Sequence, residues 1–225
     1  MEAANIGARE ADVAPATEPT AGRGAGWTPA DPGPLGLAAF AGTTFVLSII
    51  NTGLVGTHAA PGGGLLPMVA ALALAYGGIA QFAAGLWEFR TGNTFGAVAF
   101  CSFGMFWVSF FFIVQSVGKN VPTEVFSGLA LYLYMWGIFT AYMFICSLRT
   151  TGAVAAVFLL LAITFFILGI GNASLAGTHS AINGTIKLGG WVGLITALVA
   201  WYASFAAVIN STFGRVVAPV MPLRR

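Results

Sequence analysis

Six long apolar stretches divide the chain and limit what it can fold into. They run approximately over Leu35–Val55, Leu65–Phe89, Thr94–Val117, Val125–Leu148, Val154–Gly171 and Leu188–Ile209. Each is near the length of about 20 residues that an α-helix needs to cross a hydrocarbon layer of about 30 Å. Strands are excluded as spanning elements, because the alternating pattern of a barrel is missing and an open sheet would leave backbone groups unpaired in lipid. The sequence therefore predicts an all-α membrane protein with six transmembrane helices in one domain.

The composition agrees with a membrane protein and excludes several other classes. Only 7% of the residues are charged and 58% are hydrophobic, whereas soluble domains have about 25% charged residues. The basic residues form no run that could follow a phosphate backbone, so nucleic acid is not an expected partner. Cys101 and Cys146 lie in apolar stretches and are interpreted as small buried thiols. No cofactor and no metal ion are expected.

Basic residues outside the apolar stretches indicate the orientation. If the N-terminus is cytoplasmic, seven basic residues lie on that side and only Lys119 and Lys187 lie on the other. Because cytoplasmic loops accumulate Lys and Arg, we expect both termini in the cytoplasm and the protein in the plasma membrane. Residues 1–30 lack apolar periodicity and are expected to be a disordered tail. Residues 31–220 then form the six-helix transmembrane domain, and residues 221–225 form a short basic cytoplasmic tail.

Glycine pairs at a spacing of four residues indicate where helices could approach each other closely. Gly92/Gly96 and Gly189/Gly193, the latter continued by Ala197, have the small-xxx-small spacing of helix contacts in lipid. Chance is the alternative, because the chain contains 30 glycines. Close packing is the preferred interpretation.

The polar residues at membrane depth are nearly all uncharged. No carboxylate occupies the middle of any apolar stretch, and Glu88 lies at the inner end of the second stretch beside Arg90, as an interfacial anchor or a gate. Buried charge is costly, so this pattern argues against an Asp/Glu proton relay. It also argues against an enzyme, since an intramembrane hydrolase needs paired acids or a cluster of metal ligands. Neutral groups that could hydrogen-bond a small solute in a narrow pore are Asn51, Gln81, Asn172, Thr43 and Thr44.

The stretch DPGPLGLAAF, at Asp31–Phe40, resembles the signature NPxPLGL of the acetate uptake transporter family, which includes the bacterial succinate–acetate permeases. The resemblance covers about residues 30 to 220 in order. It continues through YGGIAQFAAGLWEFRTGNTFG (Tyr76–Gly96), YMWGIFTAYMF (Tyr134–Phe144), ILGIGN (Ile167–Asn172) and FGRVVAP (Phe213–Pro219).

This resemblance implies a protomer assembled as a homohexamer, with a separate pore in each protomer for acetate and related small monocarboxylates, and for succinate in some members. Two aromatic side chains and a leucine narrow the pore in such proteins, and the matching positions are Phe40, Phe103 and Leu161. Members of the family commonly have Tyr at the position of Phe103 and Asn at that of Asp31. The missing hydroxyl removes a hydrogen-bond donor from the narrowest region. Asp31 could cap the first helix, and it would repel an anion at that helix terminus.

A ten-residue pattern occurs twice, as NTGLVGTHAA at Asn51–Ala60 and as NASLAGTHSA at Asn172–Ala181. Both copies lie at the outer ends of helices that run in the same direction. One interpretation is a polar collar of Asn51 and Asn172, with glycines unwinding the helix ends; the other is a repeated turn in which Gly stops each helix. His58 and His179 lie farther out and could gain charge as the outside acidifies, or be solvated loop residues without a role.

The predicted function follows from these residues and from the resemblance together. Acetate is nearly all anion at neutral pH and enters hydrocarbon only at high cost, so it needs a protein path. We predict a channel or transporter for acetate and related small monocarboxylates, whose partners are these acids, membrane lipids and other copies of the chain. The missing relay favours a channel-like path, and the resemblance allows proton-linked uptake. The alternatives are a neutral-solute pore for ammonia, urea or short amides, and a scaffold or sensor that transports nothing.

Overall fold

The computed structural model describes residues 27, 29–55, 65–117, 124–177 and 182–223. His58 and His179 lie outside these residues. The described part of the chain contains six helical spans that are long and apolar enough to cross a membrane, as predicted. Their elements are α1 (Gly33–Thr52), α2 (Leu66–Leu74), the π-helical turn η1 (Ala75–Ala80), α3 (Gln81–Thr91), α4 (Thr94–Val117), α5 (Val125–Ser147), α6 (Gly152–Ala173) and α7 (Gly184–Phe213).

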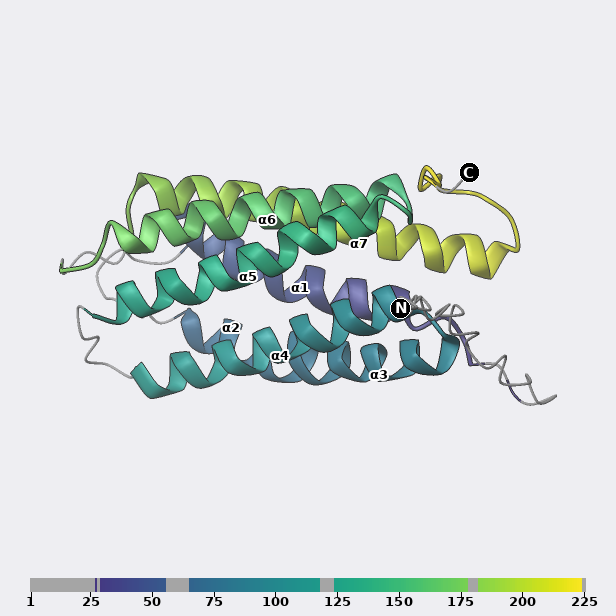
Figure 1. Ribbon diagram of the computed structural model, residues 1–225, viewed down its shortest axis with the longest axis horizontal. Helices are drawn as coiled ribbons and strands as arrows, with labels where there is room; N and C mark the ends of the chain where they lie inside the picture. The colour runs from purple at the N-terminus through teal and green to yellow at the C-terminus, as the bar shows by residue number, and fades with distance from the viewer. Residues whose placement is uncertain (1–26, 28, 56–64, 118–123, 178–181, 224–225) are drawn as a thin grey trace, which may run out of the picture.

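The helices run side by side along the long axis of the molecule, and the start of α1 and the end of α7 lie at the same end (Figure 1). The helix α1 packs on α7, α7 on α6, and α6 on α5, while the second span (α2, η1 and α3) packs on both α1 and α4. The contact between α4 and α5 closes this circuit and is the sparsest of these contacts. The six spans therefore form a ring, and side chains fill its middle.

The second span contains a feature that hydropathy does not reveal, the π-helical turn η1 between α2 and α3. A methyl group on Gly77 would lie 2.6 Å from Thr43 Oγ1 and 2.8 Å from Trp107 Cδ1, so α1 and α4 both approach the backbone there. A methyl group on Gly78 would lie 2.5 Å from the Ala73 carbonyl oxygen. Two glycines thus let the helix widen by one residue where it touches two neighbours. Such π-helical turns often occur at functional sites.

Glycines also determine how closely α7 approaches its neighbours. A methyl group on Gly189 would meet Leu168 of α6 at 2.6 Å, and one on Gly193 would meet Ser48 Oγ of α1 at 2.5 Å. The predicted close packing at Gly189 and Gly193 is therefore confirmed. The prediction for Gly92 is wrong, because Gly92 has a φ of 80° and ends α3, with no atom near its missing side chain. Its place after the last turn of a helix, where an αL residue is favoured, explains this glycine.

The chain after α7 folds back as a strap, which we define as Gly214–Leu223. Gly152 N and Ala153 N, at the start of α6, donate to the carbonyl oxygens of Met221 and Val220, and Leu223 N donates to Thr150 O. The side chain of Asn210 accepts from Val217 N and Ala218 N, and Tyr202 OH donates to Pro219 O at 2.6 Å. The strap thus satisfies backbone groups that a helix leaves unpaired at its first turn. It continues past residue 220, where the sequence had suggested the start of a tail.

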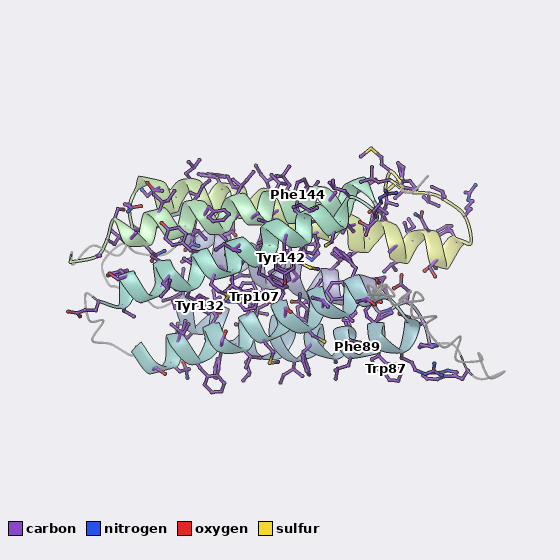
Figure 2. All side chains as sticks on the ribbon, viewed as in Figure 1. Trp87, Phe89, Trp107, Tyr132, Tyr142 and Phe144 are labelled. Carbon is purple, nitrogen blue, oxygen red and sulfur yellow. The ribbon has the colours of Figure 1, made fainter. Side chains whose placement is uncertain are left out.

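Large apolar side chains cover the outside of the bundle, as expected for a surface that faces lipid. Trp87 and Phe89 are 47% and 61% exposed and point outward from α3, whereas Trp107 lies inside the bundle (Figure 2). The cysteines are free, but Cys146 is exposed on α5. The expectation of two buried thiols is therefore wrong for Cys146, and Cys101 is only half-buried, because an apolar stretch in lipid has an outer face as well as an inner one. The six apolar spans and their apolar outer face make this an integral membrane protein.

Candidate functional site: a constriction and an adjacent polar layer

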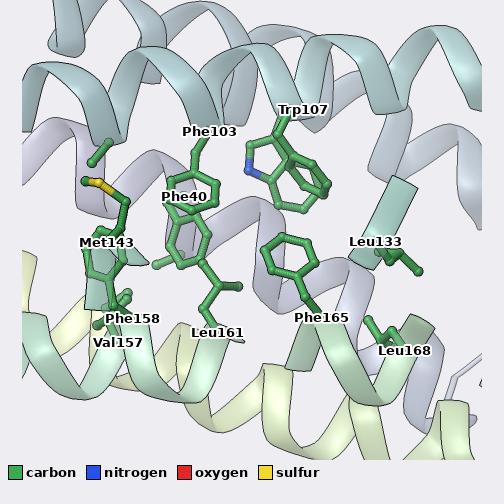
Figure 3. Close-up of a cluster of buried hydrophobic side chains, with 14 of the residues drawn as sticks. Phe40, Phe103, Trp107, Leu133, Met143, Val157, Phe158, Leu161, Phe165 and Leu168 are labelled. Atoms are coloured by element: carbon green, nitrogen blue, oxygen red, sulfur yellow. The ribbon is translucent and has the colours of Figure 1, made fainter. Parts of the chain in front are cut away.

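Three helices bring Phe40, Phe103 and Leu161 together in the middle of the ring (Figure 3). The three side chains come from α1, α4 and α6, and each is no more than 4% exposed. The ring centroids of Phe40 and Phe103 are 5.9 Å apart. The structure therefore collects the three proposed constriction residues into one apolar cluster.

Aromatic side chains surround Phe103 and hold its ring in place. Phe139 of α5 meets it edge to face at 5.3 Å, and Trp136 of α5 lies 5.8 Å away. On the side of α6, Phe158 lies 6.1 Å away and Phe165 is stacked at 6.4 Å. Offset and edge-to-face rings attract one another, so this packing fixes the position of Phe103 without any hydroxyl.

A second layer of side chains lies one helical turn from the constriction. The helices α1, α4 and α6 run in the same direction, so a residue four positions later on each reaches this layer. These residues are Thr44, Trp107 and Phe165, all of them buried. The Thr44 hydroxyl and the Trp107 indole nitrogen have no hydrogen-bond partner in the described part of the structure.

Gln81 of the second span adds a third unpartnered polar atom to the interior. Its side chain is 1% exposed, and its Oε1 accepts no hydrogen bond from the described residues. Thr43 is fully buried and donates to Ala39 O at 3.1 Å. A buried polar group without a partner is unfavourable by about 1–3 kcal/mol, so native proteins rarely keep one that meets neither solvent nor a ligand. Thr44, Gln81 and Trp107 therefore each carry a buried polar atom whose hydrogen-bonding capacity is unused in the described part of the structure.

Asn51 and Asn172 occupy equivalent positions on two helices. Each lies 11 residues after a constriction residue, Asn51 after Phe40 and Asn172 after Leu161. Eleven residues are about three turns, so both lie on the constriction side of their helices and about 16 Å farther along. The Asn172 amide donates to Leu168 O of its own helix at 2.8 Å. Gly53, with a φ of 77°, ends α1 directly after Thr52, as the helix-end interpretation of the repeat expects, but α6 ends at Ala173 with Ser174 at its C-cap, so a glycine stops only the first of the two helices.

Two carboxylates lie together at the opposite end of the bundle, where α1 begins. Asp31 Oδ1 accepts from Gly33 N at 2.9 Å, in a turn just before α1, whereas the N-cap position of the helix is occupied by Pro32. Glu88 is 2% exposed and accepts from Thr91 Oγ1 at 3.1 Å. The expected pair of Glu88 with Arg90 does not form, because Glu88 points inward and Arg90 is exposed. A methyl group on Gly33 would contact both acids, at 3.0 Å from Asp31 and 3.4 Å from Glu88, so the two carboxyl groups lie close together at this end of the bundle.

Two residues near the constriction, Trp107 and Tyr132, were not singled out from the sequence. Trp107 could have been found from its spacing, since it follows Phe103 by one turn. Tyr132, whose hydroxyl reaches the backbone of α4, carries no such signal because its partner is a main-chain carbonyl. In the described residues, no group of three or more His, Cys, Asp or Glu side chains could hold a metal ion.

Comparison with known proteins identifies the family. The sequence profile of the GPR1/FUN34/yaaH family matches residues 16–225. The chain belongs to this family. The relationship suggested by the motifs is therefore confirmed, and it covers the whole helical bundle.

Relatives in the GPR1/FUN34/yaaH family carry names of transport proteins. Acetate permease A of Emericella nidulans is 40% identical over 202 residues, which are 85% of this chain and 65% of that protein. The succinate-acetate/proton symporter SatP of Escherichia coli is 39% identical over 85% of this chain and 95% of its own length. The ammonia transport outward protein 2 of Saccharomyces cerevisiae is 38% identical, and this chain spans 61% of it. The chain thus spans less than two thirds of the two fungal proteins.

A solved structure of the family resembles the bundle described above. The structure of the bacterial acetate channel SatP aligns with a TM-score of 0.74 and 37% sequence identity. The alignment covers 86% of this chain and 99% of SatP. The six-helix fold is therefore that of a known membrane channel.

Proposed function

We propose that this chain forms a transmembrane pore for acetate and related small monocarboxylates, with succinate as a further substrate. The observation that carries this proposal is the cluster of Phe40, Phe103 and Leu161 beside a layer with unpartnered polar atoms on Thr44 and Trp107, with a further such atom on Gln81 in the interior. Acetate consists of an apolar methyl group bonded directly to a polar carboxylate. An apolar constriction next to hydrogen-bond donors matches both ends of such a molecule.

The polar layer has a distinct role in this proposal. The Trp107 indole N–H and the Thr44 hydroxyl can each donate to a carboxylate oxygen, which replaces part of its hydration shell. Gln81 can donate through its amide, or accept from a protonated acid through Oε1. Asn51 and Asn172 offer a further pair of amides about three turns away, toward the end opposite the strap. Charge-assisted hydrogen bonds of this kind offset the cost of moving an anion out of water.

The membrane context completes the proposal. We place the protein in the plasma membrane as a homohexamer with both termini in the cytoplasm, in keeping with the distribution of Lys and Arg. Asp31 and Glu88 then lie at the cytoplasmic mouth. Asp31 repels an anion there, and the buried carboxyl group of Glu88 lies next to it. No enzymatic role is proposed, since the relatives above are named as transport proteins.

Flux through purified protein in liposomes tests the proposed function. At pH 7.5 acetate is almost entirely ionised, so leakage of the neutral acid through lipid is small. We expect uptake of labelled acetate well above that of protein-free liposomes, and little uptake of labelled urea or methylammonium. The relative named for ammonia transport makes the reverse result a real alternative. Flux of methylammonium without flux of acetate would replace this proposal with a neutral-solute pore, and no flux of any solute would favour a scaffold.

Replacing Gln81 with leucine is expected to lower acetate flux about tenfold. The reason is the loss of one hydrogen bond to the carboxylate in a buried site. The free energy of unfolding is expected to stay equal or to rise, because the change removes a buried carbonyl oxygen without a partner. The matched control is Gln115→Leu, at an exposed position near the C-terminal end of α4. Equal flux through the Gln81→Leu variant and the wild type would remove Gln81 from the site.

A further inference from the structure

The interface between α4 and α5, which we call the α4–α5 seam, has the sparsest backbone contacts of the ring. Aromatic side chains fill it. Backbone approaches between these two helices are few. Tyr132 of α5 stacks on Phe106 of α4 at 5.6 Å with an interplanar angle of 21°. Trp136, one turn along α5, meets the same Phe106 ring edge to face at 5.3 Å. The distance between the two helices is thus set by side chains and not by backbone contact.

One hydroxyl group joins the two helices directly. Tyr132 OH donates to the Phe106 carbonyl oxygen at 2.9 Å and lies 2.7 Å from Ser109 Oγ. Ser109 Oγ itself lies 2.8 Å from the same carbonyl oxygen, and its single proton can go either to that oxygen or to the Tyr132 hydroxyl oxygen. Tyr132 is therefore anchored to one turn of α4 through two oxygen atoms. In an apolar seam these groups have few other partners, so their mutual hydrogen bonds persist.

This anchored turn lies directly beside the constriction. Phe106 follows Phe103 by three residues on α4, and Trp136 and Phe139 of α5 are the rings that press on Phe103. Trp136 is one turn from Tyr132 on the same helix. If α4 and α5 moved apart at Tyr132, Trp136 and Phe139 would therefore move away from Phe103, and the Phe103 ring would be able to shift.

We propose that Tyr132 is a positioning residue that sets the upper size limit of the acids that pass the constriction. This inference rests on the proposed function, because it concerns which solutes cross the same pore. The hydroxyl keeps α4 and α5 at a fixed separation, so Phe103 stays pressed toward Phe40 and Leu161. The aromatic stacking of Tyr132 on Phe106 survives loss of the hydroxyl, but it allows the two rings to slide.

The test compares Tyr132→Phe with wild type by the ratio of butyrate uptake to acetate uptake in liposomes. Removing the hydroxyl is expected to raise this ratio about threefold to tenfold, the range that corresponds to one or two interhelical hydrogen bonds in a membrane protein. Ser109→Ala is expected to raise it less, and the double variant is expected to match Tyr132→Phe alone. The matched control is Tyr134→Phe, because Tyr134 lies over Gly169 of α6, on the other seam of α5.

The outcomes of this test distinguish a failure of the inference from a failure of the proposed function. If wild-type protein passes acetate and the ratio is unchanged in folded Tyr132→Phe, the inference is wrong and the proposed function stands. A fall in melting temperature without a change in the ratio would make Tyr132 a structural tie only, and it too would overturn the inference. An equal rise in Tyr134→Phe would show a general loosening of α5 and would likewise overturn the inference. If the wild type passes no acetate, the proposed function fails, and the inference falls with it.

Discussion

Replacing Leu161 with alanine is expected to raise the flux of butyrate relative to acetate about tenfold or more. The Leu161 side chain is 4% exposed and completes the cluster with Phe40 and Phe103. Truncating it removes three carbon atoms from the narrowest part of the proposed pore and leaves room for a longer chain. The same change is expected to lower the free energy of unfolding by about 2–5 kcal/mol, as in other buried Leu→Ala substitutions. Uptake of both acids into liposomes measures the first effect, and thermal unfolding measures the second.

Leu159→Ala is the matched control for this prediction. Leu159 lies two residues earlier on α6 and is 43% exposed on the outer surface. Its truncation removes the same atoms from the same helix but leaves the constriction intact, so the uptake ratio should stay at the wild-type value. A ratio that changes equally in both variants would mean that α6 responds as a whole, and Leu161 would then lose its place in the constriction.

Replacing Gly190 with alanine is expected to prevent stable assembly of the bundle. The added methyl group would lie 2.5 Å from Thr52 N, 2.7 Å from Asn51 C and 2.9 Å from Ser48 O. All three are backbone atoms of α1, so no side chain can rotate away and α1 must separate from α7. We expect a loss of about 3 kcal/mol or more, the upper part of the range for overpacking. Size-exclusion chromatography in detergent and thermal unfolding would show aggregated protein or a much lower melting temperature.

The control for the Gly190 prediction is Gly128→Ala in α5. No atom lies within 4 Å of the position that its methyl group would take. Alanine favours a helix over glycine by about 1 kcal/mol, so this variant should be as stable as wild type or slightly more stable. A Gly190→Ala protein that melts like Gly128→Ala would contradict the close contact between α1 and α7.

Hydropathy predicted the architecture well because a membrane span must be long, apolar and helical. The predicted stretch Val154–Gly171 lies within the observed α6, and Leu188–Ile209 lies within α7, which is longer at both ends. The start of α7 was missed because Asn183, Gly184 and Lys187 are not apolar, although Asn183 Oδ1 caps the helix by accepting from Ile186 N. The π-helical turn was missed because it depends on Thr43 and Trp107 in two other helices.

Predicting the site needed more than the pattern of apolar residues. Phe40, Phe103 and Leu161 were chosen through the resemblance to a known family, and nothing in their own spacing sets them apart from the other apolar side chains. The structure adds that they meet. Trp107 and Tyr132 were not chosen, because an aromatic residue in an apolar stretch looks like core. Their importance comes from one polar atom each, which is unpartnered in Trp107 and bound to the backbone in Tyr132.

The strap links two parts of the chain that are made at different times. Val220 and Met221 are synthesised after all six spans, yet their carbonyl oxygens accept from the first N–H groups of α6. During biogenesis that turn must keep its free N–H groups in water until the segment after α7 arrives. A nascent chain that ends before residue 220 would therefore lack these two acceptors, and its α6 would keep only the Thr151 side chain as a cap on Val154 N. The hydrogen bonds between the strap and the start of α6 thus form late, after the six spans have been made.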